Sequence, residues 1–168
     1  MSELNQNRDP RLVVDAPGIV GFYEREFYPL SNFSSFQVQW RGKLWPTSEH
    51  GYQAAKFMEV KEDLVERVLL ARSAHEAFAL ARAHTEHIRS DWAETKVDVM
   101  TDLLRHKLGQ HAYVRSKLIA TKDWKLVEDS EKDGFWGIGP DGQGQNQLGT
   151  IWMKLREELQ DGQITIQG

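Results

Sequence analysis

The sequence of 168 residues contains no cysteine, which excludes disulfide bonds, thiolate metal sites and a cysteine nucleophile. No apolar run approaches the roughly 20 residues that span a bilayer, and the first residues lack the apolar core of a signal peptide. We therefore expect a cytoplasmic protein that is not embedded in a membrane. Basic residues are not in excess either, because the chain has 21 Lys and Arg but 25 Asp and Glu, for a net charge of −4. Any contact with nucleic acid is therefore expected in a local pocket, not on an extended basic surface.

The remaining composition is that of an ordinary globular protein. Hydrophobic residues make up 40% and charged residues 27% of the chain, which is enough apolar material to bury a core. Residues 1–18 are polar, contain two prolines and end in a Pro-Gly turn signal. We expect a flexible lead-in over 1–18 and a single domain over 19–168.

The hydrophobic periodicity predicts an α+β fold that is predominantly helical, with a small strand and hairpin portion near the N-terminus. Strand-forming residues occur at 19–23, 36–45 and 124–128, with Arg-Gly-Lys interrupting the second segment. Apolar residues spaced by three and four predict helices over 63–72, 74–83, 91–108, 113–121 and the second half of 133–159.

Several residues are expected to end elements or to lie in loops. Ser73, Ser90 and Asn146 are placed to cap helices at their N-termini, and Gly109 is a C-terminal signal. The segment FYPLSNFSSF at 27–36 predicts an irregular loop whose polar side chains, Asn32 among them, are available to a ligand.

The densest group of chemically capable side chains lies at one predicted helix start. Thr47 or Ser48 can cap this helix, and Glu49 then falls in the first turn, where the helix dipole favours an anion. At 100° per residue, Glu49, Gln53 and Lys56 project within a narrow arc. This arc is either an active-site wall or an ordinary solvated face.

A glycine-rich segment, DGFWGIGPDGQGQNQLG at 133–149, precedes the last helix. Its six glycines allow the backbone to approach a ligand closely, and a glycine loop that runs into a helix start suits an anion such as phosphate. Gly137, Gly139 and Gly142 spell G-x-G-x-x-G, but Pro140 interrupts the loop and too little chain follows for a βαβ unit. We therefore expect no dinucleotide site and no cofactor.

Other chemically capable residues each have two interpretations. Trp92 is either a core residue or a pocket wall on which a base stacks, and Lys96 one turn later can meet a phosphate. Asp133 is either a turn residue or a carboxylate held at a pocket mouth.

The histidines carry weaker predictions. His84 and His87 lie three residues apart with Glu86 between them, but a helical pair without a third ligand is not a metal site, so we expect dipole interactions at a helix end and no metal. His50 points about 100° away from Glu49, and we expect it to be packed or hydrogen-bonded.

Four motifs in this order resemble the NADAR superfamily and its YbiA-like N-glycosidases. They are YPLSNF at 28–33, WPTSEHGYQAAKF at 45–57, IRSDW at 88–92 and the glycine-rich segment at 133–149. The resemblance spans residues 22–159. It implies a hydrolase that cleaves the bond between ribose C1′ and a nitrogen.

Carried over by matching positions, the resemblance assigns catalytic roles to Glu49, Trp92 and Asp133. It implies substrate-binding roles for Asn32, Lys56, Trp136 and Asn146. Helical spacing and the glycine loop add Gln53, Lys96 and Gly137 to the predicted substrate-binding residues.

The resemblance leaves several functions open. One branch of the family acts on ribosylamino-pyrimidine phosphate intermediates of riboflavin biosynthesis, as metabolite damage control that releases ribose 5-phosphate. Another branch removes ADP-ribose from guanine in nucleic acid, and a non-catalytic ADP-ribose-binding module is a third alternative. The acidic balance of the chain favours the small metabolite as partner.

The chemistry sets independent requirements. Breaking an N-glycosidic bond builds positive charge on the ribose, so a carboxylate must stabilise that charge or activate water, and the leaving nitrogen needs a proton. Glu49 and Asp133 can share these tasks, or Asp133 can orient the substrate. Lys56 can bind a phosphate or form a Schiff base with an opened ribose.

Overall fold

The computed structural model describes residues 17–167, so the predicted lead-in over 1–18 lies almost entirely outside the described residues. The described residues form two compact units. The first, here called the α2 unit, comprises 32–112 and 165–167. The second, the α7 unit, comprises 17–31 and 113–164.

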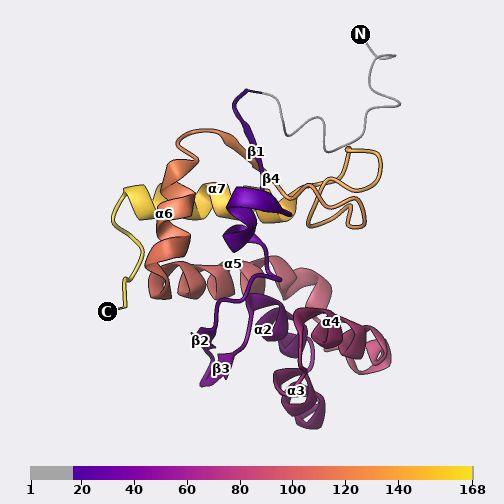
Figure 1. Cartoon of the computed structure of the whole chain (residues 1–168). Helices are drawn as coiled ribbons and strands as arrows, with labels where there is room; N and C mark the ends of the chain where they lie inside the picture. The colour runs from indigo at the N-terminus through magenta and orange to yellow at the C-terminus, as the bar shows by residue number, and fades with distance from the viewer. Residues whose placement is uncertain (1–16, 168) are drawn as a thin grey trace. The chain divides into compact units, whose positions relative to one another are not determined.

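The α2 unit combines one hairpin with a group of helices (Figure 1). Helix α2 is buried over its whole length, and it packs against α3, α4 and α5. In chain order the elements are β2 (Val38–Trp40), β3 (Lys43–Trp45), α2 (Ser48–Ala55), α3 (Glu62–Leu69), α4 (Ala74–Arg82), the 3-10 turn η2 (Thr85–His87) and α5 (Trp92–Gln110).

The hairpin positions the chain that enters α2. Strands β2 and β3 pair antiparallel through a tight turn in which Arg41 and Gly42 both have positive φ, of 48° and 79°. Two buried tryptophans fix the hairpin: the Trp45 indole donates to the Trp40 carbonyl at 3.0 Å, and the Trp40 indole donates to Asp102 of α5 at 2.8 Å. The end of β3, only two residues before α2, is thereby held in place.

The α7 unit is built on two short parallel strands, β1 (Ile19–Gly21) and β4 (Lys125–Val127). Helix α7 (Gln147–Gln160) packs on β4 through its buried apolar face. The unit also contains the 3-10 helix η1 (Arg25–Leu30) and most of α6 (Ala112–Ala120).

The expected fold class, α+β with predominant helix and a small strand and hairpin portion, is confirmed. The single domain over 19–168 stays a prediction. Among the described residues, no helix combines the length and the apolar content needed to cross a bilayer.

Three expectations about loops and helix ends were wrong. Residues 25–30, partly within the expected irregular loop, form η1 despite Pro29, since short 3-10 turns need few amide donors. Asp91, not Ser90, occupies the N-cap of α5. Gly109 does not end that helix, because it is buried inside the last turn and its carbonyl accepts from Gln167 N–H.

Candidate active site

Helix α2 begins as the sequence predicts and buries its acid. The Thr47 hydroxyl accepts from the His50 backbone N–H and caps the helix, while Glu49 lies in the first turn and is only 5% exposed. The Glu49 carboxylate accepts a 2.7 Å hydrogen bond from the side-chain amide of Gln53, one turn later. The dipole, the amide and the burial hold one carboxylate in one orientation.

Gln53 is 2% exposed, and its amide oxygen has no hydrogen-bond partner among the described residues. Because an ionised carboxylate only accepts, the Gln53 nitrogen faces Glu49 and the oxygen faces elsewhere. Leaving a buried acceptor unpaired costs on the order of 1–3 kcal/mol. Such an atom is expected where a substrate hydroxyl or a water molecule completes the site.

Lys56 caps the C-terminus of α2 and is half-buried. Burial lowers the pKa of its ammonium group, the negative charge of Glu49 raises it, and the positive charge of Lys96 on α5 lowers it. Its Nζ lies 5.5 Å from the centre of the Tyr52 ring. Two cations and one carboxylate therefore influence one another on this face of the α2 unit.

Trp92, the first residue of α5, is half-buried and packs against Tyr52. The ring centres are 5.2 Å apart and the planes are tilted by 51°. The indole packs against α2 while some of its surface remains exposed, and its role as a pocket wall stays a prediction.

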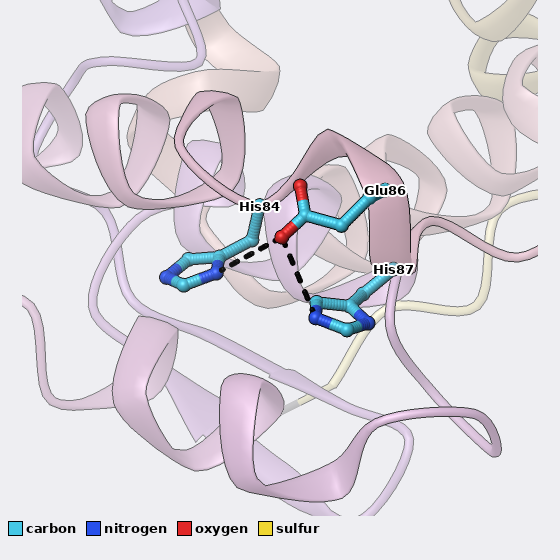
Figure 2. Close-up of side chains that lie close together, drawn as sticks. All are labelled: His84, Glu86 and His87. Atoms are coloured by element: carbon cyan, nitrogen blue, oxygen red, sulfur yellow. Dashed lines mark ion pairs between the residues drawn. The ribbon is translucent and has the colours of Figure 1, made fainter.

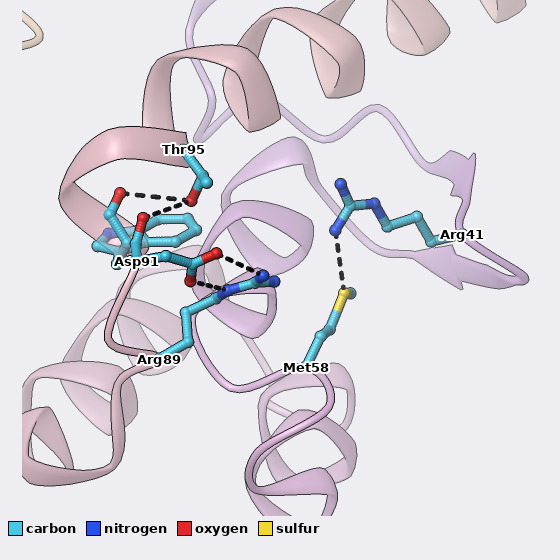
Figure 3. Close-up of polar contacts among 6 residues, drawn as sticks. Arg41, Met58, Arg89, Asp91 and Thr95 are labelled. Carbon is cyan, nitrogen blue, oxygen red and sulfur yellow. Dashed lines mark hydrogen bonds and ion pairs between the residues drawn. The ribbon is translucent and has the colours of Figure 1, made fainter.

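The chain just before Trp92 is braced by an ion pair, shown in Figure 3. Arg89 Nε and Nη2 lie 2.6 and 3.0 Å from the two carboxylate oxygens of Asp91. Arg89 N–H donates to the Lys56 carbonyl, so the end of α2 is tied to the start of α5. The Thr95 hydroxyl donates to the Asp91 carbonyl and closes the first turn.

Asn32 lies at the other end of this face, but its side chain is engaged within the protein. Its Oδ1 accepts from the Ser48 hydroxyl at 3.1 Å, and its Nδ2 lies 3.4 Å from Met100 Sδ. Its carbonyl accepts from Glu49 N–H. Asn32 thus orients the start of α2, and any contact with substrate has to use its remaining exposed surface.

His50 is packed and hydrogen-bonded, as expected. Its ring nitrogens lie 2.8 Å from the Thr47 hydroxyl and 3.0 Å from the Ala71 carbonyl. Burial lowers the pKa of this histidine, which favours the neutral ring.

The glycine-rich segment belongs to the α7 unit. Asp133 Oδ1 accepts from the N–H groups of Phe135 and Trp136, both at 2.9 Å, which is a turn stabilised by its own carboxylate. The rings of Phe135 and Trp136 meet edge to face at 4.8 Å. Asp133 therefore fixes the position of Trp136.

Asn146 and Gly137 serve the packing of this segment. Asn146 precedes α7 but makes no side-chain cap, contrary to the expectation. Its φ is +50°, and its amide instead bonds across to the Glu128 N–H and the Leu126 carbonyl, both at 2.9 Å. A Cβ on Gly137 would lie 2.7 Å from the Glu128 carbonyl, so backbone packing alone accounts for this glycine.

The α7 unit also contains a cleft of about 390 Å³ that none of the predicted site residues lines. Its lining mixes acids and bases with the aromatic rings of Tyr23, Phe27 and Trp124.

Sequence reasoning missed Tyr52. This residue follows Glu49 by three positions and precedes Lys56 by four, so helical spacing already places it on the same face. The structure brings Glu49, Gln53, Lys56, Trp92 and Lys96 together within the α2 unit, whereas Asp133, Trp136, Gly137 and Asn146 belong to the α7 unit.

Comparison with known proteins shows which proteins this chain resembles. Residues 21–160 match the model of the NADAR domain family. The chain is 40% identical to the N-glycosidase YbiA of Escherichia coli over 143 residues, which cover 84% of this chain and 88% of that protein. The solution structure of E. coli YbiA has a TM-score of 0.76 at 37% identity, covering 87% of this chain and 86% of that one.

A riboflavin biosynthesis protein of Vibrio vulnificus is 46% identical over 132 residues, 79% of this chain. The match spans only 35% of that longer protein.

Proposed function

This chain belongs to the NADAR domain family, and from that premise we propose that it is an N-glycosidase acting on ribosylamino-pyrimidine phosphates, intermediates of riboflavin biosynthesis. The products are ribose 5-phosphate and the free aminopyrimidine. The names of the E. coli and V. vulnificus relatives support the reaction type and the metabolic setting. The observation that carries the proposal is the buried Glu49 carboxylate, held by Gln53 on the same helix face as a lysine and an aromatic ring.

Glu49 supplies the carboxylate that the reaction needs. As the C1′–N bond breaks, its electron pair leaves with the nitrogen, which takes up a proton, and the ribose ring becomes cationic. A water oxygen then bonds to C1′, and Glu49 accepts the proton that this water loses. The amide of Gln53 fixes the carboxylate, and its unpaired oxygen is available to a ribose hydroxyl or to the water.

The two lysines and the two rings suit the rest of the substrate. Lys56 and Lys96 offer two positive charges to one phosphate dianion, and the phosphate relieves the repulsion between them. Trp92, supported by Tyr52, offers a flat surface to the pyrimidine or to the cationic ribose. Asn32 holds the start of α2 beneath Glu49.

Within the α7 unit, Asp133 orients Trp136 through two backbone N–H groups, and the contact of Trp136 with substrate stays a prediction. Gly137 and Asn146 maintain the backbone of this segment. Asp133 is thus a positioning residue in this proposal, and the electron-rich aminopyrimidine departs without a dedicated protein acid.

The test is incubation of the purified protein with a ribosylamino-pyrimidine 5′-phosphate and, separately, with ADP-ribosylated guanine DNA, followed by chromatography of the released base. We expect turnover of the small metabolite. Glu49→Gln keeps the hydrogen bond to Gln53 and should lower kcat/KM by about 10²–10⁴-fold. Glu94→Gln, an exposed residue in the first turn of α5, is the matched control.

Faster release of guanine than of the pyrimidine would move the proposal to the ADP-ribosyl branch. Tight binding of ADP-ribose with no base released from either substrate would identify a binding module instead. Full turnover by Glu49→Gln would remove Glu49 from the mechanism.

A further inference from the structure

The turn between α4 and α5 brings together two imidazoles and a carboxylate that the proposed reaction does not use (Figure 2). We propose that His84, Glu86 and His87 form a binding site for one Zn²⁺ ion. The sequence places Glu86 between the two histidines but does not show that its carboxylate reaches them. The structure adds the third ligand, because the Glu86 side chain turns back between the two rings (Figure 2).

The three ligand atoms lie slightly farther apart than the ligands of a bound zinc ion. Glu86 Oε1 lies 3.9 Å from His84 Nδ1 and 3.4 Å from His87 Nε2, and the three ligand atoms all lie within 4.8 Å of one another. Tetrahedral Zn²⁺ with bonds of about 2.0–2.1 Å separates its ligands by about 3.3 Å. Small side-chain rotations therefore bring all three atoms onto one ion.

The backbone of the turn is already fixed. His84 N–H donates to the Ala81 carbonyl at 3.1 Å, and His87 N–H donates to the His84 carbonyl at 3.0 Å. Ile88 N–H closes the turn on the Thr85 carbonyl at 3.2 Å. Binding then orders only three side chains, which limits the entropy lost on binding.

The ligand set selects the kind of metal. Two imidazoles and one carboxylate suit Zn²⁺, whereas Mg²⁺ and Ca²⁺ prefer oxygen ligands alone. Glu86 and His87 are exposed, so the ion can enter from solvent and keep a water molecule as its fourth ligand.

The neighbouring cation Arg67 opposes Zn²⁺ binding, so its removal tests the proposal. Arg67 Nη1 lies 3.5 Å from His84 Nε2 and donates to it. Once Nδ1 binds a metal, Nε2 carries the ring proton and can no longer accept, so Arg67 must move away. Arg67→Ala should therefore strengthen Zn²⁺ binding.

The experiment is calorimetric titration of the metal-stripped full chain with ZnCl₂, paired with Co²⁺ absorption spectra that report tetrahedral coordination. We expect one ion per chain with a micromolar dissociation constant. His84→Ala, Glu86→Gln and His87→Ala should each weaken binding by about tenfold or more, since removal even of outer-shell partners costs that much. N-glycosidase activity of these variants should be unchanged.

The chain offers a matched control in His106 and Asp102, a histidine and a carboxylate 3.7 Å apart on α5. Because this pair is not part of the three-ligand cluster, His106→Ala should leave Zn²⁺ binding unchanged. Binding that survives His84→Ala and His87→Ala, or that disappears with His106→Ala, would overturn the proposal. So would the absence of binding to the wild-type chain at 100-fold excess of ZnCl₂ over protein.

Discussion

The face of α2 and the glycine-rich segment at 133–149 both contain polar residues that the family resemblance marks as functional, but they use them differently. On α2, Glu49 and Gln53 bond to each other, and a buried amide oxygen is left unpaired. In the glycine-rich segment, Asp133 and Asn146 bond to backbone groups of their own unit. The first arrangement leaves a buried polar atom without a partner, and the second completes the hydrogen bonds of a backbone.

This contrast separates chemical roles from structural ones. A side chain whose hydrogen bonds are completed by backbone has little capacity left for substrate. Variants on the α2 face should therefore change kinetics more than stability, and variants of the buried polar residues in the glycine-rich segment should do the reverse.

Besides Glu49→Gln, the largest effect is expected at Lys56 on the same helix. If its ammonium group anchors the phosphate, Lys56→Met should raise KM by about 100-fold, because a charge-assisted contact is worth roughly 1.5–3 kcal/mol. Lys56→Arg keeps the charge and should retain most of the activity. Steady-state kinetics on the ribosylamino-pyrimidine phosphate measures both.

Borohydride distinguishes the competing role. The lowered pKa of Lys56 raises its neutral fraction, which also suits an imine-forming amine. We expect no mass increase after borohydride treatment during turnover. A stable ribosyl adduct on Lys56, together with an inactive Lys56→Arg variant, would replace the phosphate anchor with covalent chemistry.

Asn146 should show the opposite behaviour. Asn146→Ala leaves a buried N–H at Glu128 and a carbonyl at Leu126 without partners, so the free energy of unfolding should fall by about 2–3 kcal/mol. Asn146→Gly removes the same bonds but tolerates φ of +50°, so it should be the less damaging of the two. Urea denaturation measures these losses, and Gln145→Ala, at an exposed position, is the control.

Should either Asn146 variant keep its stability and lose only activity, the structural role of Asn146 in the glycine-rich segment would be wrong.

Lys107 is a buried cation whose effect should appear in the pH dependence of stability. It is fully buried on α5, donates to Ser34 at 3.0 Å, and burial lowers its pKa to about 7. Between this value and about 10.5, the unfolded chain holds a proton that the folded chain lacks, so stability should rise with pH. The slope is at most about 1.4 kcal/mol per pH unit and is absent below the folded pKa.

Lys107→Met should remove this slope, measured as the difference from wild type in urea denaturation at pH 7, 8 and 9. Lys154→Met, an exposed position on α7, should keep it. A wild-type chain whose stability is parallel to that of Lys107→Met at all three pH values would show that this amine is not strongly perturbed.

Much of the fold followed from the sequence because its signals are local. The Thr47 cap, the first-turn Glu49 and the Arg-Gly hairpin turn all act within a few residues, and the structure confirms them. The prediction that Gly109 ends its helix was wrong, because tertiary contacts can hold a glycine within a helix. Here burial and the bond from Gln167 keep it in the last turn.

The candidate site was predictable to the extent that it lies on one helix. Glu49, Gln53 and Lys56 share a face by spacing alone, and Tyr52 follows from the same rule. The contact between Tyr52 and Trp92 joins residues 40 positions apart, and no local pattern encodes it. The bonds of Asn146 to Leu126 on β4 and to Glu128 directly after it depend equally on tertiary packing, which is why a side-chain cap was expected in their place.

The smallest effect is expected for Tyr52 and Trp92, the aromatic pair on the α2 face near Lys56. Tyr52→Leu, Trp92→Leu and the double variant form a cycle whose coupling should be about 0.5–1.5 kcal/mol, the range for tilted rings at this distance. We expect coupling both in unfolding and in kcat/KM, because the ring that supports Trp92 also sets the surface offered to substrate. The Phe33 and His75 pair, with ring centres 4.9 Å apart, is the matched control and should couple in unfolding alone. Additive losses of kcat/KM at Tyr52 and Trp92 would reduce Tyr52 to a core residue and leave Trp92 to act without it.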